Sequence, residues 1–342
     1  MTIALDATYS IGDELSGVGL YSRQLIGGLA VLHPETRFDL YYRPHRYLKS
    51  WNLDLPRNAR RRLLARPFGP GRAALFHGLN QRLPEMPMKR AVATFHDLFM
   101  MTAEYSTPEF RERFTAQARD AAGRADAVIA VSEFTRSQVV SLLGVPASKV
   151  HVVHHGIREL RLPHCERQPV ILTVGAIQKR KNVARLVEAF ERLDGDWRLV
   201  LAGSQGYGAA EILARIEASP ARARIEVTGY LTPDELAAWY ATASVFAFPS
   251  LDEGFGMPVL EAMAAGVPVV TSDRSALPEV AGDAALLVNP EDTDALREAL
   301  NKLIGDSDLR KDLAQRGAAR ARLFTWQKAA CATWEIYRNL SI

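Results

Sequence analysis

The sequence contains very little cysteine and no hydrophobic run long enough to cross a membrane. Only Cys165 and Cys331 occur among 342 residues, too few for a disulfide framework, so we expect a reducing compartment. The chain opens with neither the basic residues nor the long apolar stretch of a secretion signal. No stretch approaches the ~18 consecutive apolar residues of a transmembrane helix. We therefore expect a cytoplasmic protein.

Motifs of several common enzyme classes are also missing. The chain has no Walker lysine motif and no His-Glu-x-x-His zinc motif. Asp-x-Asp, which holds a divalent cation in some transferases, occurs three times, but each copy fits a turn or a helix start, where aspartate caps backbone amides. The three copies begin at Asp194, Asp292 and Asp306. We therefore expect no metal site, and no cofactor apart from a substrate.

The two halves of the chain differ in charge and in histidine content. Residues 1–165 hold 22 Lys+Arg and 15 Asp+Glu, whereas residues 166–342 hold 20 and 24. All eight histidines lie in the first half, so a catalytic imidazole would have to come from there. At roughly 150 residues per domain, the length also indicates two domains. The polar stretch Arg158–Pro169 is the expected boundary.

Apolar strands alternate with helices along both halves. Strands separated by helices of about ten residues predict parallel sheets covered on both faces. We therefore expect an α/β fold with two Rossmann-like, doubly wound domains, residues 1–160 and 168–324, facing a cleft. In such sheets, ligands bind at the carboxyl ends of the strands. The segments that matter most are predicted strands at Ile3–Ala7, Ala91–Phe95, Val170–Val174 and Val245–Phe248, and predicted helices at Tyr21–Leu32, Val183–Leu193 and Pro258–Ala265.

The strongest chemical signal is the segment from Phe248 to Gly266. A strand is predicted to end at Phe248, and a glycine-containing loop leads into a helix that begins near Pro258. The first amides and the dipole of a helix suit a phosphate, and glycine lets backbone approach a ligand closely. Glu253 and Glu261 flank this turn, and carboxylates accept hydrogen bonds from sugar hydroxyls. The segment predicts a nucleotide-sugar site. The glycines argue against the alternative, two glutamates that merely face solvent.

A basic turn follows the first strand of the second half. The loop begins at Gly175 and ends in Lys179, Arg180 and Lys181. An arginine fork and a lysine point charge can neutralise a diphosphate. A solvated basic turn is the alternative, and by itself it would be favoured. The glutamate-containing loop leaves the same edge of the same predicted sheet, which favours the phosphate.

Two weaker candidates lie in the first half. Gly17 and Gly19 follow the first predicted strand, but Ser22 stands where a dinucleotide fingerprint has its third glycine. A plain flexible turn explains these glycines nearly as well. His96 ends an apolar strand, from which it could hydrogen-bond a phosphate or a hydroxyl. The alternative for His96 is a structural histidine satisfied by its neighbour Asp97.

Together these residues resemble the family 4 retaining glycosyltransferases, which have the GT-B fold. The resemblance is dense over most of the second half and sparser in the first. Glu253 and Glu261 match the family's Glu-x7-Glu motif, and Lys181 matches its phosphate-binding lysine. The family's phosphate-binding arginine often lies where this chain has Ala176. We expect Arg180 to replace it.

The resemblance assigns roles to individual residues. It implies that Glu253 binds hydroxyls of the donor sugar, that Glu261 binds the ribose, and that His96 helps to position acceptor or phosphate. It also implies that the last helix, in residues 325–342, crosses back to the first domain. The expected catalytic residues are His96, Arg180, Lys181 and Glu253. The expected donor-binding residues are Gly17, Gly19, Gly175, Arg180, Lys181, Glu253, Gly254, Phe255, Gly256, Met257, Pro258 and Glu261.

The activity implied by the resemblance is that of a retaining, metal-independent hexosyltransferase. The loop sequences are similar to those of mannosyl- and rhamnosyltransferases from O-antigen and exopolysaccharide clusters, and GDP-mannose is the favoured donor. The expected acceptor is a glycan or a polyprenyl-linked sugar in polysaccharide or lipopolysaccharide synthesis. No nucleic-acid partner is expected. Because no nucleophile is apparent, transfer on the front face is favoured over a covalent intermediate.

Arginine is concentrated in one segment of the first half. Near an anionic membrane each basic residue could contribute about 1 kcal/mol of binding. This composition predicts peripheral contact with the inner face of the membrane, although a solvated helix face explains it equally well. The arginines are Arg57, Arg60, Arg61, Arg62 and Arg66.

Two other functions stay open at this point. A sugar-nucleotide epimerase or a phosphorylase could share the fold, and product analysis with and without acceptor separates these from a transferase. The third possibility is a non-catalytic, two-domain sugar-binding protein. The intact Glu253, Glu261 and Lys181 argue against such a binding-only relative.

Overall fold

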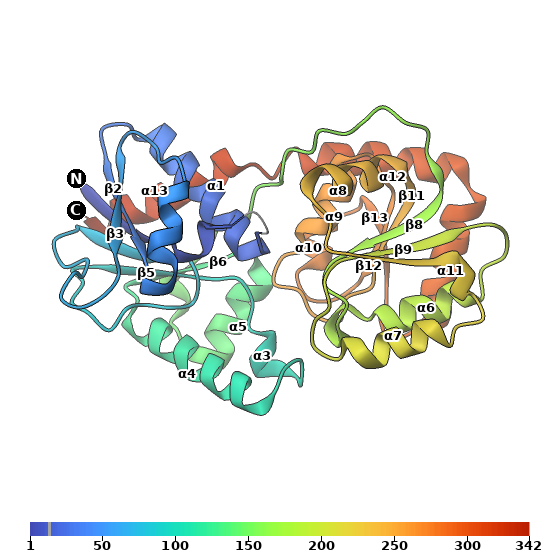
Figure 1. The fold of residues 1–342 in the computed structure, drawn as a ribbon, viewed down its shortest axis with the longest axis horizontal. Coiled ribbons are helices and arrows are strands. Elements are labelled where there is room, and N and C mark those ends of the chain that lie inside the picture. The colour runs from blue at the N-terminus through green and yellow to red at the C-terminus, as the bar shows by residue number, and fades with distance from the viewer. Residues whose placement is uncertain (13–14, 342) are drawn as a thin grey trace. The chain divides into compact units, whose positions relative to one another are not determined.

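The structure is a computed structural model that describes residues 1–12 and 15–341. It divides into two compact units, one formed by Met1–Gly156 with Thr325–Ile342 and the other by Ile157–Phe324. The first crossing between the units, at Gly156–Ile157, lies just ahead of the polar stretch expected to be the boundary. Each unit contains its own parallel β-sheet (Figure 1).

The sheet of the first unit has the strand order β3-β2-β1-β4-β5-β6-β7, with parallel pairing throughout its described strands. The direction of winding reverses between β1 and β4. Strands β4, β5 and β6 are short and buried along their whole length, as expected for a sheet covered on both faces. The strands are β1 (Thr2–Asp6), β2 (Arg37–Tyr42), β3 (Ala59–Leu63), β4 (Leu75–Gly78), β5 (Ala91–Phe95), β6 (Ala127–Ala130) and β7 (Val150–Val152).

Helices connect these strands. They are α1 (Gly17–Leu32), α2 (Pro44–Tyr47), α3 (Phe99–Thr102), α4 (Pro108–Arg124) and α5 (Glu133–Leu143), with 3₁₀ turns η1 (Thr8–Ser10), η2 (Leu48–Asn52) and η3 (Ala147–Lys149). Ser132 caps α5 by accepting a hydrogen bond from the Thr135 amide, as its position before an apolar helix predicts.

Helix α1 starts four residues earlier than predicted, at Gly17 instead of Tyr21. The Ser16 side chain caps it by accepting a hydrogen bond from the Gly19 amide at 3.2 Å. The interpretation of Gly17 and Gly19 as a plain flexible turn is therefore wrong, because both lie in the first helical turn. A Cβ at Gly19 would come within 2.8 Å of the Tyr9 carbonyl oxygen, so close packing explains this glycine.

The arginine-rich segment contains an edge strand, β3, so its interpretation as a helix face is wrong. Alternation along a strand sends Arg60 and Arg62 to one face of the sheet and Arg61 to the other. Arg60 and Arg62 both reach the buried carboxylate of Asp39 on β2. Arg61 donates to carbonyl groups of the preceding loop, including that of Ser50.

The second sheet has the order β10-β9-β8-β11-β12-β13, again parallel among its described strands. Its winding reverses between β8 and β11. The strands are β8 (Gln168–Val174), β9 (Arg198–Ala202), β10 (Ile225–Gly229), β11 (Ala243–Phe248), β12 (Val269–Ser272) and β13 (Ala285–Val288). The expected α/β class with two doubly wound sheets is confirmed.

Helices again alternate with the strands of the second sheet. They are α6 (Val183–Glu191), α7 (Ala209–Glu217), α8 (Pro233–Thr242), α9 (Met257–Ala264), α10 (Leu277–Ala281), α11 (Thr293–Gly305) and α12 (Ser307–Ala321), with 3₁₀ turns η4 (Lys179–Lys181) and η5 (Arg222–Arg224). Asp292 caps α11 and Asp306 caps α12, so two of the Asp-x-Asp sequences are helix starts as predicted.

The last helix, α13 (Trp326–Ser341), belongs to the first unit and packs against α1. The two helices approach closely at Gly28, where a Cβ would lie 3.0 Å from that of Ala330. Gly156, the last residue before the chain leaves the first unit, also lies against the start of α13, since a Cβ at Gly156 would overlap the Trp326 amide nitrogen. The His155 ring also stacks on the Trp326 ring at 5.8 Å. Glycine at position 156 thus allows the segment that leaves the first unit to pack against the segment that returns to it at Thr325.

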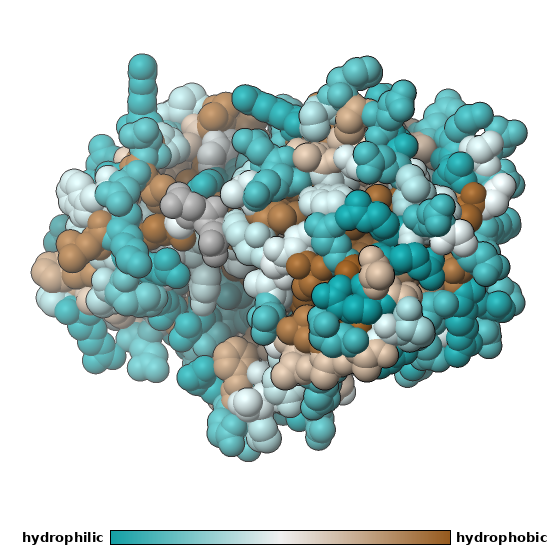
Figure 2. Space-filling model, turned by 45° about the vertical axis from the view of Figure 1, so that its right-hand side comes forward, coloured by the Kyte–Doolittle hydropathy of each residue, from teal (hydrophilic) through white to brown (hydrophobic). Residues whose placement is uncertain are grey.

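No described helix is both long and apolar enough to span a bilayer. Among the side chains that Figure 2 draws in colour, hydrophilic ones predominate and hydrophobic ones gather in small patches between them. Scattered apolar residues of this kind are normal on a protein surface.

We expect Gly156→Ala to lower the stability of the first unit by about 1–3 kcal/mol, because the new methyl group would displace the backbone of Trp326. Thermal unfolding monitored by calorimetry measures this. The matched control is Gly123→Ala in α4, where a Cβ meets nothing within 4 Å and alanine should be neutral or stabilising. Equal melting temperatures for Gly156→Ala and the wild type would contradict the packing argument.

Candidate functional site

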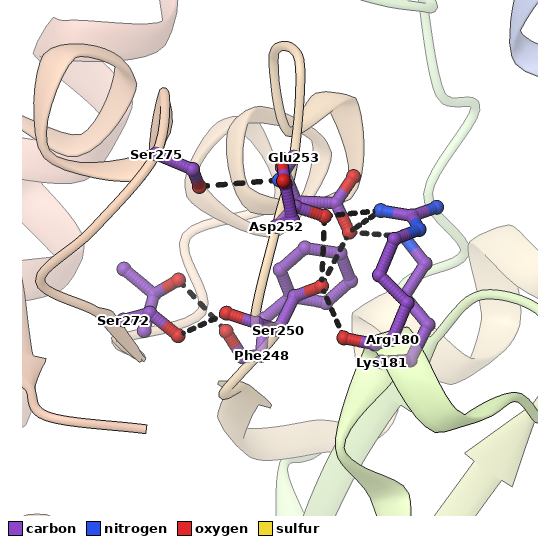
Figure 3. Close-up of polar contacts among 9 residues, drawn as sticks. Arg180, Lys181, Phe248, Ser250, Asp252, Glu253, Ser272 and Ser275 are labelled. Carbon is purple, nitrogen blue, oxygen red and sulfur yellow. Dashed lines mark hydrogen bonds and ion pairs between the residues drawn. The ribbon is translucent and has the colours of Figure 1, made fainter. Parts of the chain in front are cut away.

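Two loops meet where the winding of the second sheet reverses. β8 leads into the turn Lys179–Lys181, and the neighbouring strand β11 leads into the glycine loop before α9. Doubly wound sheets bind ligands at such a switch point, beyond the carboxyl ends of the strands. Figure 3 shows Arg180 and Lys181 of the first loop pointing toward Glu253 of the second.

Glu253 is the centre of this cluster. Its Oε1 atom is contacted by Lys181 Nζ at 2.6 Å, Arg180 Nη1 at 2.8 Å and Ser250 Oγ at 2.6 Å. Burial by itself raises the pKa of Glu253, but the charges of Arg180 and Lys181 and the hydrogen bonds from Lys181 and Ser250 lower the pKa to about 2. The side chain is therefore a buried carboxylate at neutral pH.

The two cations are themselves held in place. Lys181 Nζ lies 4.5 Å from the centroid of the Phe248 ring, a cation–π contact. Arg180 donates to the carbonyl oxygen of Asp252. The side chains of Arg180 and Lys181 are only 9% and 13% exposed. Because water is largely excluded, their charges act on a neighbouring anion more strongly than surface charges would.

Serine hydroxyls fix the glutamate loop. Ser250, besides its bond to Glu253, contacts the Arg180 carbonyl at 3.1 Å. The Glu253 amide donates to Ser275 Oγ at 3.2 Å, and Ser272 Oγ donates to the Ser250 carbonyl at 2.6 Å (Figure 3). Ser250 and Ser272 were not predicted from the sequence, because a serine after a strand carries no distinctive signal until the neighbouring loop is placed beside it.

Helix α9 begins at Met257, one residue before the predicted start. Gly256 precedes it with a φ of 107°, and a Cβ there would lie 2.7 Å from a methyl group of Leu277, so this turn requires glycine. Within the described chain no side chain caps the helix. Its first amides and the positive end of its dipole are therefore directed at the loop.

Glu261 occupies a separate environment inside α9. It is buried, Tyr240 donates a hydrogen bond to its Oε2 at 3.0 Å, and Arg158 Nε lies 3.7 Å from its Oε1. Burial raises the pKa of Glu261, and Arg158 and Tyr240 offset only part of this rise. Neither partner was predicted, since neither lies near Glu261 in the sequence.

The remaining glycine-loop candidates have different surroundings. Gly175 lies against the aliphatic part of Lys181, where a Cβ would come within 3.2 Å of Cε. The Phe255 ring is buried and packs edge-to-face against Phe324 at 5.8 Å. A ligand at this loop would therefore meet the backbone of Phe255 and not its ring.

His96 is buried in the first unit. Its Nε2 atom is 2.9 Å from the Leu79 carbonyl, and its Nδ1 has no hydrogen-bond partner among the described residues. Burial lowers the pKa of His96 to about 4, so the ring is neutral at pH 7. His77 is also buried, and Thr94 and Tyr337 engage its two ring nitrogens, as in a structural histidine.

In the described part of the chain, His, Cys, Asp and Glu side chains nowhere form a group of three or more that could hold a metal ion.

Two family descriptions match the chain. Residues 161–320 match Glycosyl transferases group 1, and residues 30–159 match Glycosyltransferase Family 4. The chain is 30% identical to the O-antigen chain mannosyltransferase B of Escherichia coli, over 98% of this chain and 99% of that protein. These matches show that the chain is a glycosyltransferase. The chain belongs to the family 4 glycosyltransferases, with a group 1 domain in its second half.

Solved structures support the same fold. Sucrose-phosphate synthase from Thermosynechococcus elongatus aligns with a TM-score of 0.78 at 22% identity, over 99% of this chain and 98% of that one. Anabaena HepE, solved with UDP and glucose, aligns with a TM-score of 0.72 at 18% identity, over 99% of each chain. The predicted GT-B fold is confirmed.

The two buried glutamates should respond oppositely to neutralisation. Glu253→Gln leaves two buried cations without their anion, and we expect it to cost about 3 kcal/mol at pH 7. Glu261→Gln removes a carboxylate whose charge burial disfavours, so its melting temperature should equal or exceed that of the wild type. Calorimetry at pH 7 measures the melting temperature and the unfolding free energy of both variants against the wild type.

The pH dependence provides the check on this contrast. The depressed pKa of Glu253 means that its contribution to stability is present above about pH 4.5 and is lost as the pH falls toward 2. The stability difference between wild type and Glu253→Gln should shrink over that interval. A difference independent of pH would contradict the assignment of the stabilisation to the charged carboxylate.

Proposed function

We propose that the protein transfers a hexose, with mannose from GDP-mannose favoured, to a glycan or polyprenyl-linked acceptor in polysaccharide or O-antigen synthesis, with retention of configuration and without a metal. The observation that carries this proposal is the convergence of two desolvated cations, a helix N-terminus that no described side chain caps, and a buried carboxylate at one switch point. These groups match a diphosphate and the hydroxyls of the sugar attached to it.

In the proposed reaction, the bond between the anomeric carbon and the diphosphate oxygen breaks, and its electron pair goes to that oxygen. The acceptor hydroxyl oxygen bonds to the anomeric carbon on the same face, and its proton passes to the leaving phosphate. Arg180, Lys181 and the start of α9 lie where the negative charge grows. They would stabilise the transition state more than the ground state.

Each glutamate has a proposed ligand. In the described structure no residue donates to Glu253 Oε2, so this atom can accept a hydroxyl of the sugar while Oε1 faces the cations. Glu261 is proposed to accept a hydroxyl of the ribose. The backbone of Gly175 and of residues 254–258 would line the phosphate and the sugar.

The proposal assigns Arg180 to the place of the family arginine missing at Ala176. Its support is that Arg180 Nη1 and Lys181 Nζ reach the same carboxylate oxygen, so both can face one diphosphate. For the first unit, Gly17 and Gly19 at the start of α1 and the neutral ring of His96 are proposed contacts of donor or acceptor. His96 at neutral pH would act as a hydrogen-bonding group without charge.

The Escherichia coli relative is described as a mannosyltransferase of O-antigen chains, which supports the sugar and the pathway. HepE was solved with UDP and glucose, which supports a nucleotide-sugar donor in this fold and makes UDP-glucose the rival donor. A GT-B epimerase or phosphorylase stays the second candidate, because it would use the same diphosphate site.

Lys181→Gln should lower kcat by at least about 100-fold, because it removes one charge that faces the leaving group. Lys179→Gln is the matched control, since Lys179 is half-exposed, pairs with Glu211 and lies in the same turn. Transfer from GDP-mannose and from UDP-glucose to a mannose-terminated, lipid-linked acceptor measures both, with EDTA present.

Three results of that assay would contradict the proposal. They are equal activity of Lys181→Gln and Lys179→Gln, loss of activity on chelation with EDTA, and conversion of the donor without any acceptor. The last result would favour the epimerase.

The proposed membrane contact has a specific basis in the first unit. Residues 43–72 contain nine Lys or Arg and a single acidic residue, Asp54. Three large hydrophobic side chains of this segment are exposed: Leu48 at 79%, Trp51 at 62% and Phe68 at 62%. Cationic side chains among exposed aromatic ones suit an anionic bilayer surface, and we propose contact at the cytoplasmic face of the membrane.

Vesicle sedimentation tests this contact. We expect binding to phosphatidylglycerol-containing vesicles, weaker binding at high salt, and no binding to pure phosphatidylcholine. Trp51→Ala should weaken binding about tenfold. Val31→Ala should not weaken binding, although Val31 in α1 is an even more exposed apolar residue. Equal binding of Trp51→Ala and Val31→Ala would contradict membrane contact through residues 43–72.

A further inference from the structure

Three donors converge on a single oxygen atom of the cluster. Lys181 Nζ, Arg180 Nη1 and Ser250 Oγ all contact Oε1 of Glu253, at 2.6, 2.8 and 2.6 Å. The Glu253 side chain is 10% exposed, so water provides little alternative solvation. The pair of cations therefore already has an anionic ligand, supplied by the protein itself.

Any phosphate that binds the same two cations meets this carboxylate. The bound phosphate oxygens and Glu253 Oε1 would carry like charges a few ångströms apart in a site that excludes water, where repulsion is weakly screened. Lys181 and Arg180 together carry two positive charges, and Glu253 neutralises one. A diphosphate must therefore compete with Glu253, which is always present, for these two cations.

We propose that Glu253 acts as a resident counter-anion that competes with the diphosphate for Lys181 and Arg180, and that this competition promotes release of the nucleoside diphosphate product. The inference rests on the proposed function. It adds to the sugar-binding role of Glu253 a second role directed at the leaving group.

The competition affects donor and product unequally. With the intact donor bound, Glu253 Oε2 can accept a hydroxyl of the sugar, and this bond offsets the repulsion from the diphosphate. Once the sugar has been transferred, that bond is gone and the repulsion stays. The product is thus held less tightly than its two cations alone would hold it.

Ser250 is a positioning residue in this arrangement. Its hydroxyl contacts Glu253 Oε1 at 2.6 Å and the Arg180 carbonyl at 3.1 Å, and the side chain is fully buried. It keeps the carboxylate directed at the cations. Removing it should weaken the competitor without removing the competitor's charge.

Isothermal titration calorimetry with inorganic pyrophosphate, GDP and UDP tests the proposal on the full chain. Glu253→Gln should bind pyrophosphate and the preferred nucleoside diphosphate at least about tenfold more tightly than the wild type, since one charged competitor is removed. Ser250→Ala should bind them more tightly by a smaller factor. Both variants should also transfer more slowly, because the sugar contact is lost or displaced.

Glu261→Gln is the matched control. It makes the same chemical change eight residues away, in contact with Tyr240 and Arg158 instead of the two cations. Its pyrophosphate affinity should equal that of the wild type, whereas its affinity for the nucleoside diphosphate should fall. Thermal unfolding provides a second readout, because pyrophosphate should raise the melting temperature of Glu253→Gln more than that of the wild type.

The outcomes distinguish a failure of the proposed competition from a failure of the proposed function. If the wild type binds a nucleoside diphosphate and transfers sugar, but folded Glu253→Gln and Ser250→Ala bind pyrophosphate no more tightly, competition by Glu253 is overturned and the proposed function stands. If neither wild type nor variants bind any of the three probes, the diphosphate site itself is overturned and the inference with it.

Discussion

The buried ion cluster of Glu253 with Arg180 and Lys181 is the constraint on which the second unit depends. A carboxylate that is almost completely removed from water is tolerated only because two cations and a serine hydroxyl meet one of its oxygens. The cluster joins the loops after β8 and β11, which are adjacent strands far apart in the sequence. The ion cluster can therefore form only when these two strands pair correctly, and the paired strands place these charges together only when each charge has its partner.

The same cluster connects stability with the proposed chemistry. Groups that hold an anion in a dry site are already oriented, so little reorganisation is needed when negative charge develops on a leaving group. Glu261, eight residues further on, shows the opposite balance, because burial outweighs its partners and raises its pKa. Two glutamates near the start of one helix thus have opposite pKa shifts. The pKa of Glu253 is lowered, and that of Glu261 is raised.

Sequence patterns predicted the parts of this structure that are encoded locally. A short apolar run placed β5 at Ala91–Phe95 without error, and glycine with proline placed the start of α9 within one residue. The same approach missed that Ser16 caps α1, and it did not recognise Arg60–Arg62 as an edge strand, because their partner Asp39 lies on another strand. Ser250, Tyr240 and Arg158 were missed for the same physical reason: their contacts come from tertiary packing.

The structure of the protein with the nucleoside diphosphate of its preferred donor is the most direct measurement for this account. We expect phosphate oxygens within hydrogen-bond distance of Lys181 Nζ and Arg180, with the β-phosphate at the first amides of α9. A diphosphate bound elsewhere, with no phosphate oxygen near Lys181 or Arg180, would contradict it.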